Sequence, residues 1–580
     1  MRRWFKYIKP YLSSFILGPF GMIIEVIGEM FMPLVLAQII NEGLAGTLSI
    51  GSSIGYAAIL VAIVLFMMAG GVAGAYFGAK ASVNFAADLR ADIYTKVQGF
   101  SFSNIDKFSA GSLVTRMTND VTQLQNFVNM LLRMALRSPG LFIGGIIMAI
   151  SLNPSLSVVL AVTMPLMIIF ILVLIRISFP RFNIMQKKID KLNSTVRENV
   201  TNVRVVKSFV REDFENEKFE EDNAQLKNAG MRAVKVMIFM GPVMNLFMYA
   251  TVIAVIWFGH GMVLESASGM KVGDLSAFIS YTMQILSSLM MVTFLLMITS
   301  RALASGRRIC EVLDEQIDIK DTESANSALR IERGEIEFSN VSFRYYKSSE
   351  EAVLDKINLK IPAGATVGII GSTGCGKTTL VSMIPRLYDV DSGEVLIDGV
   401  NVKDYTLVNL REGIGMVLQK NLLFSGTIAE NLRWGDMDAT DEEVRLASSS
   451  SAADKFVSSF KDGYDTVLDK GGLNLSGGQK QRLCIARALI KKPKILILDD
   501  STSAVDTATE SQIREAFRKD IPDCTKLIIA QRISSVRDAD IIVVMNDGII
   551  TGVGTHDELL SGNAEYGEIY YSQMDSKEGA

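Results

Sequence analysis

The chain has 580 residues, of which 49% are hydrophobic and 21% charged, and its formal net charge is −4. This composition excludes a disordered, collagen-like or coiled-coil protein, and the weakly acidic balance gives no reason to expect a nucleic-acid partner. The four cysteines are too scattered for a disulfide framework or a zinc site, and they fit a reducing cytosol. Because 24 of the 29 methionines precede residue 300, we expect two halves of the chain in different solvents.

The first twelve residues combine four Lys or Arg residues with aromatic ones. This pattern predicts an interfacial amphipathic helix over residues 1–12. A secretory signal peptide would continue with a short apolar core and a small-residue cleavage site, whereas a full-length apolar span follows here.

Six apolar segments follow, each with few or no charged residues. A helix of about 20 such residues crosses a bilayer, and no soluble core requires six of them in succession. We therefore predict an all-α polytopic membrane domain over residues 1–305. Its predicted spans cover residues 15–40, 54–79, 138–152, 155–177, 236–262 and 273–300.

The segments between the spans differ in charge. Residues 80–137 and 176–235 are rich in Lys and Arg, whereas Lys271 is the only such residue in the loops on the opposite side. Positively charged loops stay in the cytoplasm, so we expect both termini to be cytoplasmic, in a plasma (bacterial inner) membrane. At about 1.5 Å per helical residue, the two basic segments can form long hairpins with tips near residues 102–110 and 209–217.

The second half of the chain is polar. Residues 306–334 lack apolar periodicity and are interpreted as a linker to a domain over residues 335–580. In that domain a β-branched strand at 366–370 leads into G-x-x-x-x-G-K-T and then into an apolar helix, which is the context of a phosphate-binding loop. The loop residues are Gly371, Ser372, Thr373, Gly374, Cys375, Gly376, Lys377 and Thr378, with Thr379 next in the helix.

This loop predicts a nucleoside-triphosphate site. Its backbone N–H groups wrap phosphates, Lys377 reaches the β- and γ-phosphates, and the Thr378 hydroxyl ligates Mg²⁺. The apolar run 495–498 ends in Asp499, and a carboxylate at the carboxyl end of a parallel strand can hold the same ion. We expect an α/β P-loop ATPase domain that binds ATP with Mg²⁺.

A third motif, Leu475-Ser476-Gly477-Gly478-Gln479, resembles the signature sequence of ATP-binding cassette (ABC) proteins. With six spans before one ATPase domain, the whole chain is similar to a type IV ABC half-exporter. The resemblance implies that two ATPase domains sandwich ATP head to tail, with the signature helix N-terminus of one domain meeting the γ-phosphate held by the other. The signature residues in contact with that phosphate would be Ser476, Gly477, Gly478 and Gln479.

The same resemblance assigns roles to single residues. It implies that Tyr345 stacks on adenine, that Gln419 belongs to the glutamine loop near the metal, and that Asp506 ends the loop Ser503-Ala504-Val505-Asp506. It also implies that the two hairpin tips are coupling helices that dock on ATPase domains.

Two positions depart from the family pattern. Members that hydrolyse ATP well carry a glutamate as general base after the magnesium aspartate, and Asp500 stands there in this chain. Its carboxylate would lie about 1.5 Å (one bond) farther from the attacking water, and a misplacement of about 1 Å can lower a rate about 10²-fold. The family's switch histidine is replaced by Gln531, whose amide cannot carry a charge.

Both departures together resemble the degenerate half of a heterodimeric exporter. We expect the P-loop of this chain to bind ATP and hydrolyse it poorly, while its signature completes an active site with a sibling chain that supplies the glutamate and the histidine. The favoured cargo is a small amphipathic drug or lipid. The alternatives are a homodimeric slow transporter of lipids or peptides, an exporter-shaped importer, and an ATP-gated channel or regulatory subunit.

Glu25 and Glu29 lie four residues apart in the first span and so share one helical face. Ionised residues in a span are costly, about 2.5–3.5 kcal/mol at its centre, and usually face a cavity or a partner. The pair is interpreted either as an attractor of cationic substrate or as an interhelical structural contact. Met283, Met290 and Phe294 of the sixth span are further candidates, because flexible thioethers suit an adaptable pocket, although methionine is also common against lipid.

Overall fold

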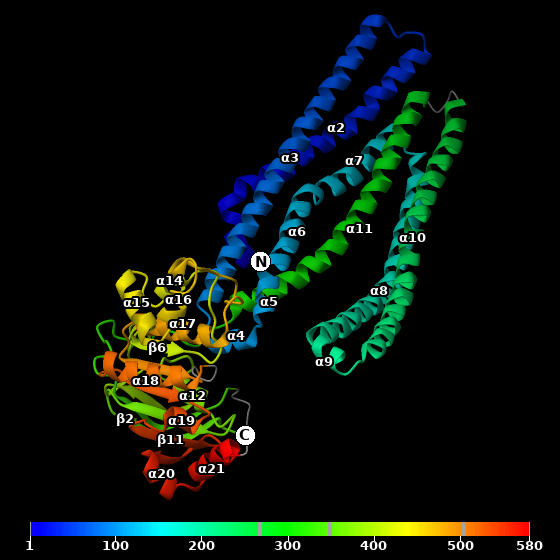
Figure 1. Ribbon diagram of the computed structural model, residues 1–580. Coiled ribbons are helices and arrows are strands. Elements are labelled where there is room, and N and C mark those ends of the chain that lie inside the picture. Colours follow the sequence, from blue (N-terminus) through cyan, green and yellow to red (C-terminus); the bar gives the residue numbers. More distant parts are fainter. Residues whose placement is uncertain (1, 265–269, 346–350, 501–504, 579–580) are drawn as a thin grey trace. The chain divides into compact units, whose positions relative to one another are not determined.

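The computed structural model describes residues 2–264, 270–345, 351–500 and 505–578. These residues form two compact units (Figure 1). The first, the membrane unit, comprises Met1–Val97 and Gly111–Asp314, and the second, the ATPase unit, comprises Gln98–Ala110 and Glu315–Ala580. The domain boundaries expected at residues 305 and 334 stay predictions.

The membrane unit is entirely helical in its described residues. A short 3₁₀ turn, Lys9–Tyr11, follows the first helix, and a π-helical turn, Arg116–Asp120, joins α5 to α6. Its helices are α1 (Arg2–Ile8), α2 (Leu12–Leu44), α3 (Ile50–Gln98), α5 (Ala110–Thr115), α6 (Val121–Met134), α7 (Arg137–Leu152), α8 (Ser157–Thr201), α9 (Val203–Ser208), α10 (Glu212–Leu264) and α11 (Val272–Asp314).

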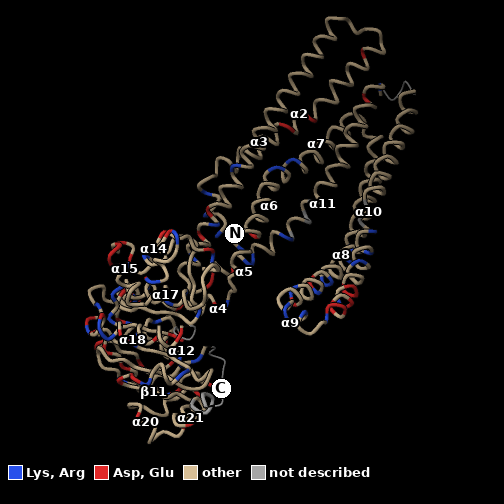
Figure 2. The backbone as a smooth tube through the Cα atoms, viewed as in Figure 1, with Lys and Arg blue, Asp and Glu red and all other residues tan. Residues whose placement is uncertain are grey.

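Six helical stretches among the described residues are long and apolar enough to cross a membrane. They are Arg3–Leu44, Ile50–Gln98, Ala110–Leu152, Ser157–Thr201, Glu212–Leu264 and Val272–Val292. Figure 2 shows few charged residues along much of α2, α3, α7 and α11, and many near α9. This pattern confirms the predicted all-α domain with six spans.

Helices α2 and α3 approach closely through glycines. A Cβ added at Gly21 would lie 2.6 Å from the carbonyl oxygen of Gly70 and 2.6 Å from the nitrogen of Gly74. Small residues three or four positions apart allow such backbone contact between membrane helices. The α2–α3 pair therefore depends on the absence of side chains at these positions.

A second packing centre joins α11 to α2 and α7. Phe278, Tyr281 and Ile285 of α11 are fully buried in a cluster that includes Leu141 and Ala149 of α7. The Tyr281 hydroxyl donates a hydrogen bond of 2.6 Å to the carbonyl oxygen of Met30 in α2. The tyrosine thereby satisfies its polar end inside an apolar cluster.

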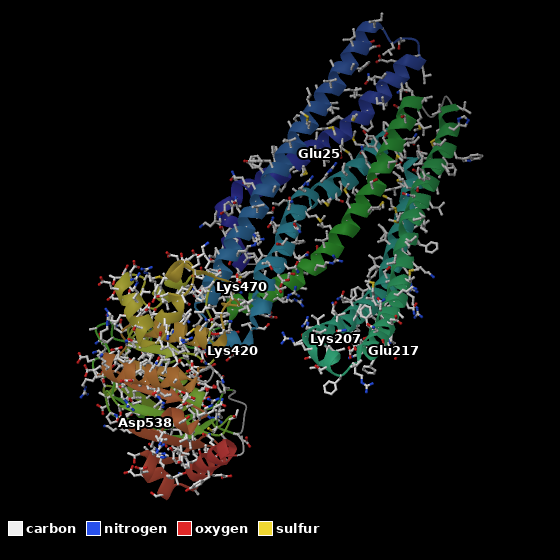
Figure 3. All side chains as sticks on the ribbon, viewed as in Figure 1. Glu25, Lys207, Glu217, Lys420, Lys470 and Asp538 are labelled. Carbon is white, nitrogen blue, oxygen red and sulfur yellow. The ribbon has the colours of Figure 1, made fainter. Side chains whose placement is uncertain are left out.

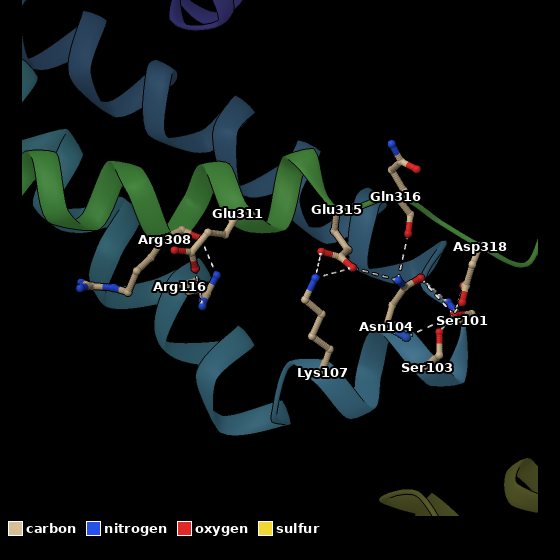
Figure 4. A network of polar contacts seen from close by, with 10 residues as sticks. All are labelled: Ser101, Ser103, Asn104, Lys107, Arg116, Arg308, Glu311, Glu315, Gln316 and Asp318. Atoms are coloured by element: carbon tan, nitrogen blue, oxygen red, sulfur yellow. Dashed lines mark hydrogen bonds and ion pairs between the residues drawn. The ribbon is translucent and has the colours of Figure 1, made fainter. Parts of the chain in front are cut away.

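Near the end of α11, Arg308 and Ser305 bind the buried carboxylate of Asp120. Arg308 Nε donates to Asp120 Oδ2 at 2.8 Å, and the Ser305 hydroxyl donates to Oδ1 at 2.9 Å. A second pair joins the same two elements: Arg116 lies 3.0 Å from Glu311, and Figure 4 shows this pair beside the Arg308 side chain. These contacts join α11 to the π-helical turn.

The ATPase unit combines sheets and helices. Its strands are β1 (Ile336–Phe343), β2 (Leu354–Ile361), β3 (Thr366–Gly371), β4 (Ser392–Ile397), β5 (Val400–Asn401), β6 (Ile414–Val417), β7 (Gly426–Thr427), β8 (Val467–Leu468), β9 (Ile495–Asp499), β10 (Thr525–Ile529), β11 (Ile541–Asn546) and β12 (Ile549–Gly554). Its helices are α4 (Phe102–Lys107), α12 (Lys377–Ser382), α13 (Leu407–Glu412), α14 (Ile428–Arg433), α15 (Asp441–Ser450), α16 (Asp454–Val457), α17 (Gly477–Ile490), α18 (Thr507–Asp520), α19 (Ile533–Val536), α20 (His556–Gly562) and α21 (Ala564–Glu578).

The central sheet has the order β12-β11-β3-β10-β9-β6, in which only the β11–β12 pair is antiparallel. Strand β9 reads Ile-Leu-Ile-Leu-Asp and is buried along its whole length, as expected for a parallel strand covered on both faces. A smaller antiparallel sheet has the order β2-β1-β4-β5. Its buried side chains form a second hydrophobic core together with residues of β3 and α12. The predicted α/β ATPase domain is confirmed.

Helix α4 belongs to the ATPase unit although it precedes most of the membrane spans in sequence. Figure 4 shows Asn104 and Lys107 of α4 facing Glu315 and Gln316: Lys107 Nζ lies 2.7 Å from Glu315, and Asn104 Nδ2 donates to the Gln316 carbonyl at 2.9 Å. The first predicted hairpin tip is therefore part of the ATPase unit.

Candidate nucleotide-binding site

The order of the central sheet brings the predicted site residues to one edge. Strands β3, β10, β9 and β6 are neighbours and all parallel, so their carboxyl ends meet at the same side. The phosphate loop follows β3, Gln531 follows β10, Asp499 ends β9 with Asp500 directly after it, and Gln419 follows β6. Strand β10 lies between the loop strand and the carboxylate strand, an order that the motifs alone did not reveal.

The phosphate loop has the backbone conformation that its glycines allow. Gly374 and Gly376 have φ values of 90° and 97°, in the region that disfavours side chains. A Cβ at Gly371 would lie 2.0 Å from the carbonyl oxygen of Met545. Lys377 Nζ donates to the carbonyl oxygens of Gly371 and Ser372 at 2.9 and 2.7 Å, so its ammonium group lies within the loop.

Thr378 and Asp499 form an oxygen pair suited to Mg²⁺. The Thr378 hydroxyl donates a 3.0 Å hydrogen bond to Asp499 Oδ1, and hard oxygen ligands are what this cation prefers. Burial raises the pKa of the Asp499 carboxyl above its usual value. A bound Mg²⁺ ion would neutralise charge on the phosphates, and this hydroxyl and carboxylate are the residues that fit it.

The two atypical residues contact each other. Gln531 Nε2 donates to Asp500 Oδ2 at 3.0 Å, and the Gln419 side chain hydrogen-bonds to the same carboxylate. Burial raises the pKa of Asp500, while these bonds and the charge of Lys377 oppose the increase. The structure therefore brings together the predicted base, switch and glutamine-loop positions.

Tyr345 lies beside the start of α12. Its hydroxyl is 2.9 Å from the Thr379 hydroxyl, and its half-exposed ring makes edge contacts with Phe343 and Tyr388 at centroid distances of 5.0 and 5.2 Å. An aromatic face near the loop suits the adenine role that the resemblance implies.

The signature residues form the N-terminus of α17. Ser476 is the N-cap residue, and it exchanges hydrogen bonds with Gln479: the Gln479 N–H donates to Ser476 Oγ at 3.3 Å, and the Ser476 N–H donates to Gln479 Oε1 at 2.9 Å. Ser476 and Gly477 are exposed. An accessible N-terminus of a 14-residue helix attracts anions.

Asp506 is the N-cap of α18. It accepts hydrogen bonds from the N–H and the hydroxyl of Thr509 at 2.9 and 2.8 Å, and these bonds hold its pKa below the usual value. Of the loop assigned by resemblance, Ser503 and Ala504 lie outside the described residues.

Comparisons with known proteins agree with this geometry. Residues 15–289 match the family described as ABC transporter transmembrane region, and residues 354–503 match the family described as ABC transporter. The uncharacterized ABC transporter ATP-binding protein YfiB of Bacillus subtilis (strain 168) is 38% identical over 580 residues, 100% of both chains. The chain belongs to the ABC transporters.

Other relatives of this ABC transporter also match it over nearly their full lengths. The uncharacterized ABC transporter ATP-binding protein Rv1273c of Mycobacterium tuberculosis (strain ATCC 25618 / H37Rv) is 36% identical over 571 residues, 98% of this chain and 97% of the relative. YfiC of Bacillus subtilis, described in the same words, is 32% identical over 577 residues, 99% of this chain and 94% of the relative. One transmembrane region fused to one ATPase domain makes the chain a half-exporter, and the family implies ATP hydrolysis coupled to transport.

In the membrane unit of this transporter, the acidic pair has a partner that the sequence did not indicate. Arg137, at the start of α7, lies 3.2 Å from Glu25 Oε1 and 2.5 Å from Glu29 Oε1. Figure 3 labels the position of Glu25 in the membrane unit. Gln284 of α11 donates to the Glu29 carbonyl oxygen at 3.2 Å. The sequence places Arg137 at the end of a cytosolic basic segment, and its position directly before an uncharged run is the one sequence feature that hints at this pairing.

The remaining substrate candidates lie on α11. Met283 is half-buried and Met290 is exposed, whereas the side chain of Phe294 lies outside the described residues. Their contact with a substrate stays a prediction.

Proposed function

We propose that the chain is one half of a heterodimeric ABC exporter in which its own P-loop retains ATP and hydrolyses it slowly. The single observation behind this proposal is the Asp500–Gln531 pair, with its hydrogen bond of 3.0 Å. A general base must reach the attacking water. Asp500 is one methylene too short for the position of a glutamate, and its carboxylate already accepts hydrogen bonds from two neutral amides.

Gln531 adds a second limitation. A histidine at this position could hold a proton and a positive charge towards the γ-phosphate, and an amide can only donate a neutral hydrogen bond. In contrast, the residues expected to retain ATP are all present. They are Lys377 in the phosphate loop, Thr378 beside Asp499, and Tyr345, which would stack on the adenine ring. This combination favours binding over turnover.

The signature helix supports an active role in the second site. Ser476, Gly477, Gly478 and Gln479 match the family signature, and the N-terminus that they form is accessible. We assign them to the γ-phosphate bound by a sibling half-exporter, whose glutamate and histidine would activate water there. ATP hydrolysis would then take place mainly at the site shared with that partner.

The exposed tip of the second hairpin is a further argument for a partner chain. Figure 3 shows Lys207 and Glu217 at this tip, near α9. Between them, Phe209, Val210 and Phe214 expose 71%, 81% and 60% of their surface, and neighbouring apolar residues of this kind usually mark an interface. We propose that this tip docks on the ATPase domain of the partner.

We further propose that the complex moves amphipathic drugs or lipids outwards across the plasma membrane, with both termini and the ATPase domain cytoplasmic. In the cluster of Glu25, Glu29 and Arg137, two carboxylates share one guanidinium. The cluster thus has one carboxylate in excess, which would favour cationic cargo alongside Met283, Met290 and Phe294.

Purified chain, alone and with a co-expressed sibling, tests the proposal. Full-length protein in proteoliposomes is given Mg²⁺ and radiolabelled ATP, and both turnover and the chemical form of the retained nucleotide are measured. We expect the chain alone to retain intact ATP and to hydrolyse it about 10²-fold more slowly than the two-chain complex. Lys377→Ala is the matched control that abolishes retention.

Rapid Mg²⁺-dependent turnover by the chain alone, abolished by Asp500→Asn, would contradict the slow-site proposal and favour a homodimer. ATP-driven uptake of a cationic dye into inside-out vesicles that contain both chains tests export. Passive flux that ATP only gates would favour a channel. Unchanged dye affinity and rate in Glu25→Gln and Glu29→Gln would remove the cationic preference.

A further inference from the structure

The backbone on both sides of Arg532 is held by one side chain from the C-terminal helix. Gln573 of α21 donates from Nε2 to the carbonyl oxygen of Gln531 at 2.8 Å and accepts at Oε1 from the N–H of Ile533 at 2.9 Å. A primary amide has one end that donates and one that accepts. Each end of Gln573 is therefore matched to the backbone group that it meets.

These two backbone groups need partners. Ile533 begins the short helix α19, whose first N–H groups have no acceptor within the helix. Among the described residues, Arg532 makes no capping hydrogen bond to this helix through its side chain, so the amide of Gln573 supplies the acceptor. The carbonyl of Gln531 lies between the end of β10 and the start of α19, outside the regular hydrogen bonds of the strand and of the helix. Gln573 supplies the donor for this carbonyl.

Helix α21 is itself fixed to the sheet. Its buried Tyr566 places the hydroxyl 2.7 Å from Nδ1 of the buried His556. Glu565 accepts hydrogen bonds from Asn546 of β11 at 2.9 Å and from Thr551 of β12 at 2.5 Å. Gln573 therefore extends to the loop from a helix whose first turns are anchored on two strands.

The held loop carries the side chain that contacts Asp500. Gln573 fixes the backbone carbonyl of Gln531, and the side-chain amide of Gln531 donates to Asp500. The two glutamines therefore form a continuous series of hydrogen bonds from α21 to the nucleotide-binding site. A residue that must meet a γ-phosphate gains affinity when its backbone is already fixed.

We propose that Gln573 is a positioning residue that holds Gln531 towards the γ-phosphate, so that α21 sets the preference of this site for nucleoside triphosphate over diphosphate. This inference rests on the proposed function, in which Gln531 faces the γ-phosphate. In this proposal Gln573 acts on the nucleotide through the loop and not by direct contact. ADP lacks the γ-phosphate, and its binding should be indifferent to Gln573.

Competition binding on the full-length chain in lipid nanodiscs tests this role. The Kd values of MgATP and MgADP are measured against a fluorescent ATP analogue for the unmodified chain, Gln573→Met, Gln531→Met and the double variant. Gln573→Met keeps the length of the side chain and removes both hydrogen bonds. The exposed Glu568, also on α21, gives the matched control Glu568→Met.

We expect Gln573→Met to weaken MgATP binding about three- to tenfold, the value of one or two hydrogen bonds, and to change MgADP binding less than about twofold by the same measure. In the Gln531→Met background, Gln573→Met should cause no further change in the ratio of the Kd values for MgATP and MgADP. Gln573→Glu accepts from Ile533 but cannot donate to Gln531, so it should lose the same preference. It serves as the second variant if thermal unfolding shows that Gln573→Met is poorly folded.

Equal losses of ATP and ADP affinity in Gln573→Met and Gln573→Glu would indicate a purely structural role and overturn the inference. An ATP-selective loss in Gln531→Met without one in Gln573→Met would overturn the inference alone. If Gln531→Met itself shows no ATP-selective loss, Gln531 does not face the γ-phosphate, and that part of the proposed function fails together with the inference. Additive effects in the double variant would also contradict an action through Gln531.

Discussion

Asp500 and Gln531 restrict each other, because the carboxylate that should orient water accepts a hydrogen bond from the side chain that should contact phosphate. Asp500→Glu combined with Gln531→His restores a longer base and an ionisable switch. We expect Mg²⁺-dependent turnover at this chain's own site to rise at least about tenfold, since a positioned general base contributes about 10²–10⁴-fold. Turnover is measured in the two-chain complex with the partner's own P-loop lysine replaced.

The control for this change is Asp500→Gln with Gln531→His, which has the same side-chain length without a base. It should stay as slow as the unmodified chain. Equal rates in the glutamate and glutamine variants would mean that the length of residue 500 does not limit hydrolysis.

Asp499 is buried and should lower the stability of the ATPase unit when it is ionised. Its pKa is raised by burial, so above that pKa the charged form is less favourable in the folded state than in the unfolded one. This penalty decreases as the pH falls through the raised pKa, and it is absent below the pKa of Asp499 in the unfolded chain. Asp499→Asn keeps an acceptor for Thr378 and should raise the melting temperature at pH 7.5 by about 2–4 °C.

Two measurements check the Asp499 prediction. Thermal unfolding between pH 7.5 and pH 4 should show the variant and the unmodified chain converging as Asp499 takes up a proton. Added Mg²⁺ and ATP should stabilise the unmodified chain more than Asp499→Asn, because the variant keeps the phosphate loop and loses the carboxylate that fits Mg²⁺. A stability difference that does not vary with pH would contradict the assignment to Asp499 ionisation.

At the scale of the helices, the α2–α3 pair depends on backbone contact. A Cβ at Gly21 would lie 2.6 Å from backbone atoms of Gly70 and Gly74, so Gly21→Ala must separate the two helices. Overpacking of this kind costs about 1–3 kcal/mol, more than the helix propensity of about 1 kcal/mol that alanine gains. We expect a lower melting temperature of the purified chain in detergent.

Gly55→Ala on α3 is the matched control, because beyond its own stretch of helix no atom of the described residues lies within 4 Å of its added Cβ. It should leave the melting temperature unchanged or slightly higher, since alanine favours the helix. Equal destabilisation by both substitutions would show that close packing at Gly21 is unimportant.

The sequence predicted those elements whose signals are local. The run 495–498 before Asp499 is strand β9, and the glycines of the loop after β3 have the expected positive φ values. Contacts between distant segments could not be predicted, because they depend on which strands and helices become neighbours. The position of β10 between β3 and β9, the pairing of Arg137 with the acidic pair, and the bonds of Gln573 to the loop are all of this kind.

At the scale of the whole molecule, the chain has a complete signature helix and an atypical base and switch. A homodimer would place the atypical residues in both of its sites, whereas a sibling with glutamate and histidine leaves one site fully equipped. In the proposed heterodimer, the P-loop and the signature of this chain would serve different sites. The P-loop would hold one ATP, and the signature would act on the ATP bound by the partner.

This division of roles predicts different effects for substitutions at the signature. Ser476→Arg removes the cap of α17 and blocks its N-terminus, and in the two-chain complex it should lower ATP turnover about 10²–10³-fold, the usual cost of losing an oriented donor. Retention of ATP at this chain's own P-loop should stay unchanged, because in the proposed heterodimer the partner's signature would complete that site. Thr440→Ala removes an equivalent capping box from α15 and controls for the structural cost of a lost cap, about 1 kcal/mol. Loss of ATP retention in Ser476→Arg, with turnover preserved, would reverse the assignment of the two sites.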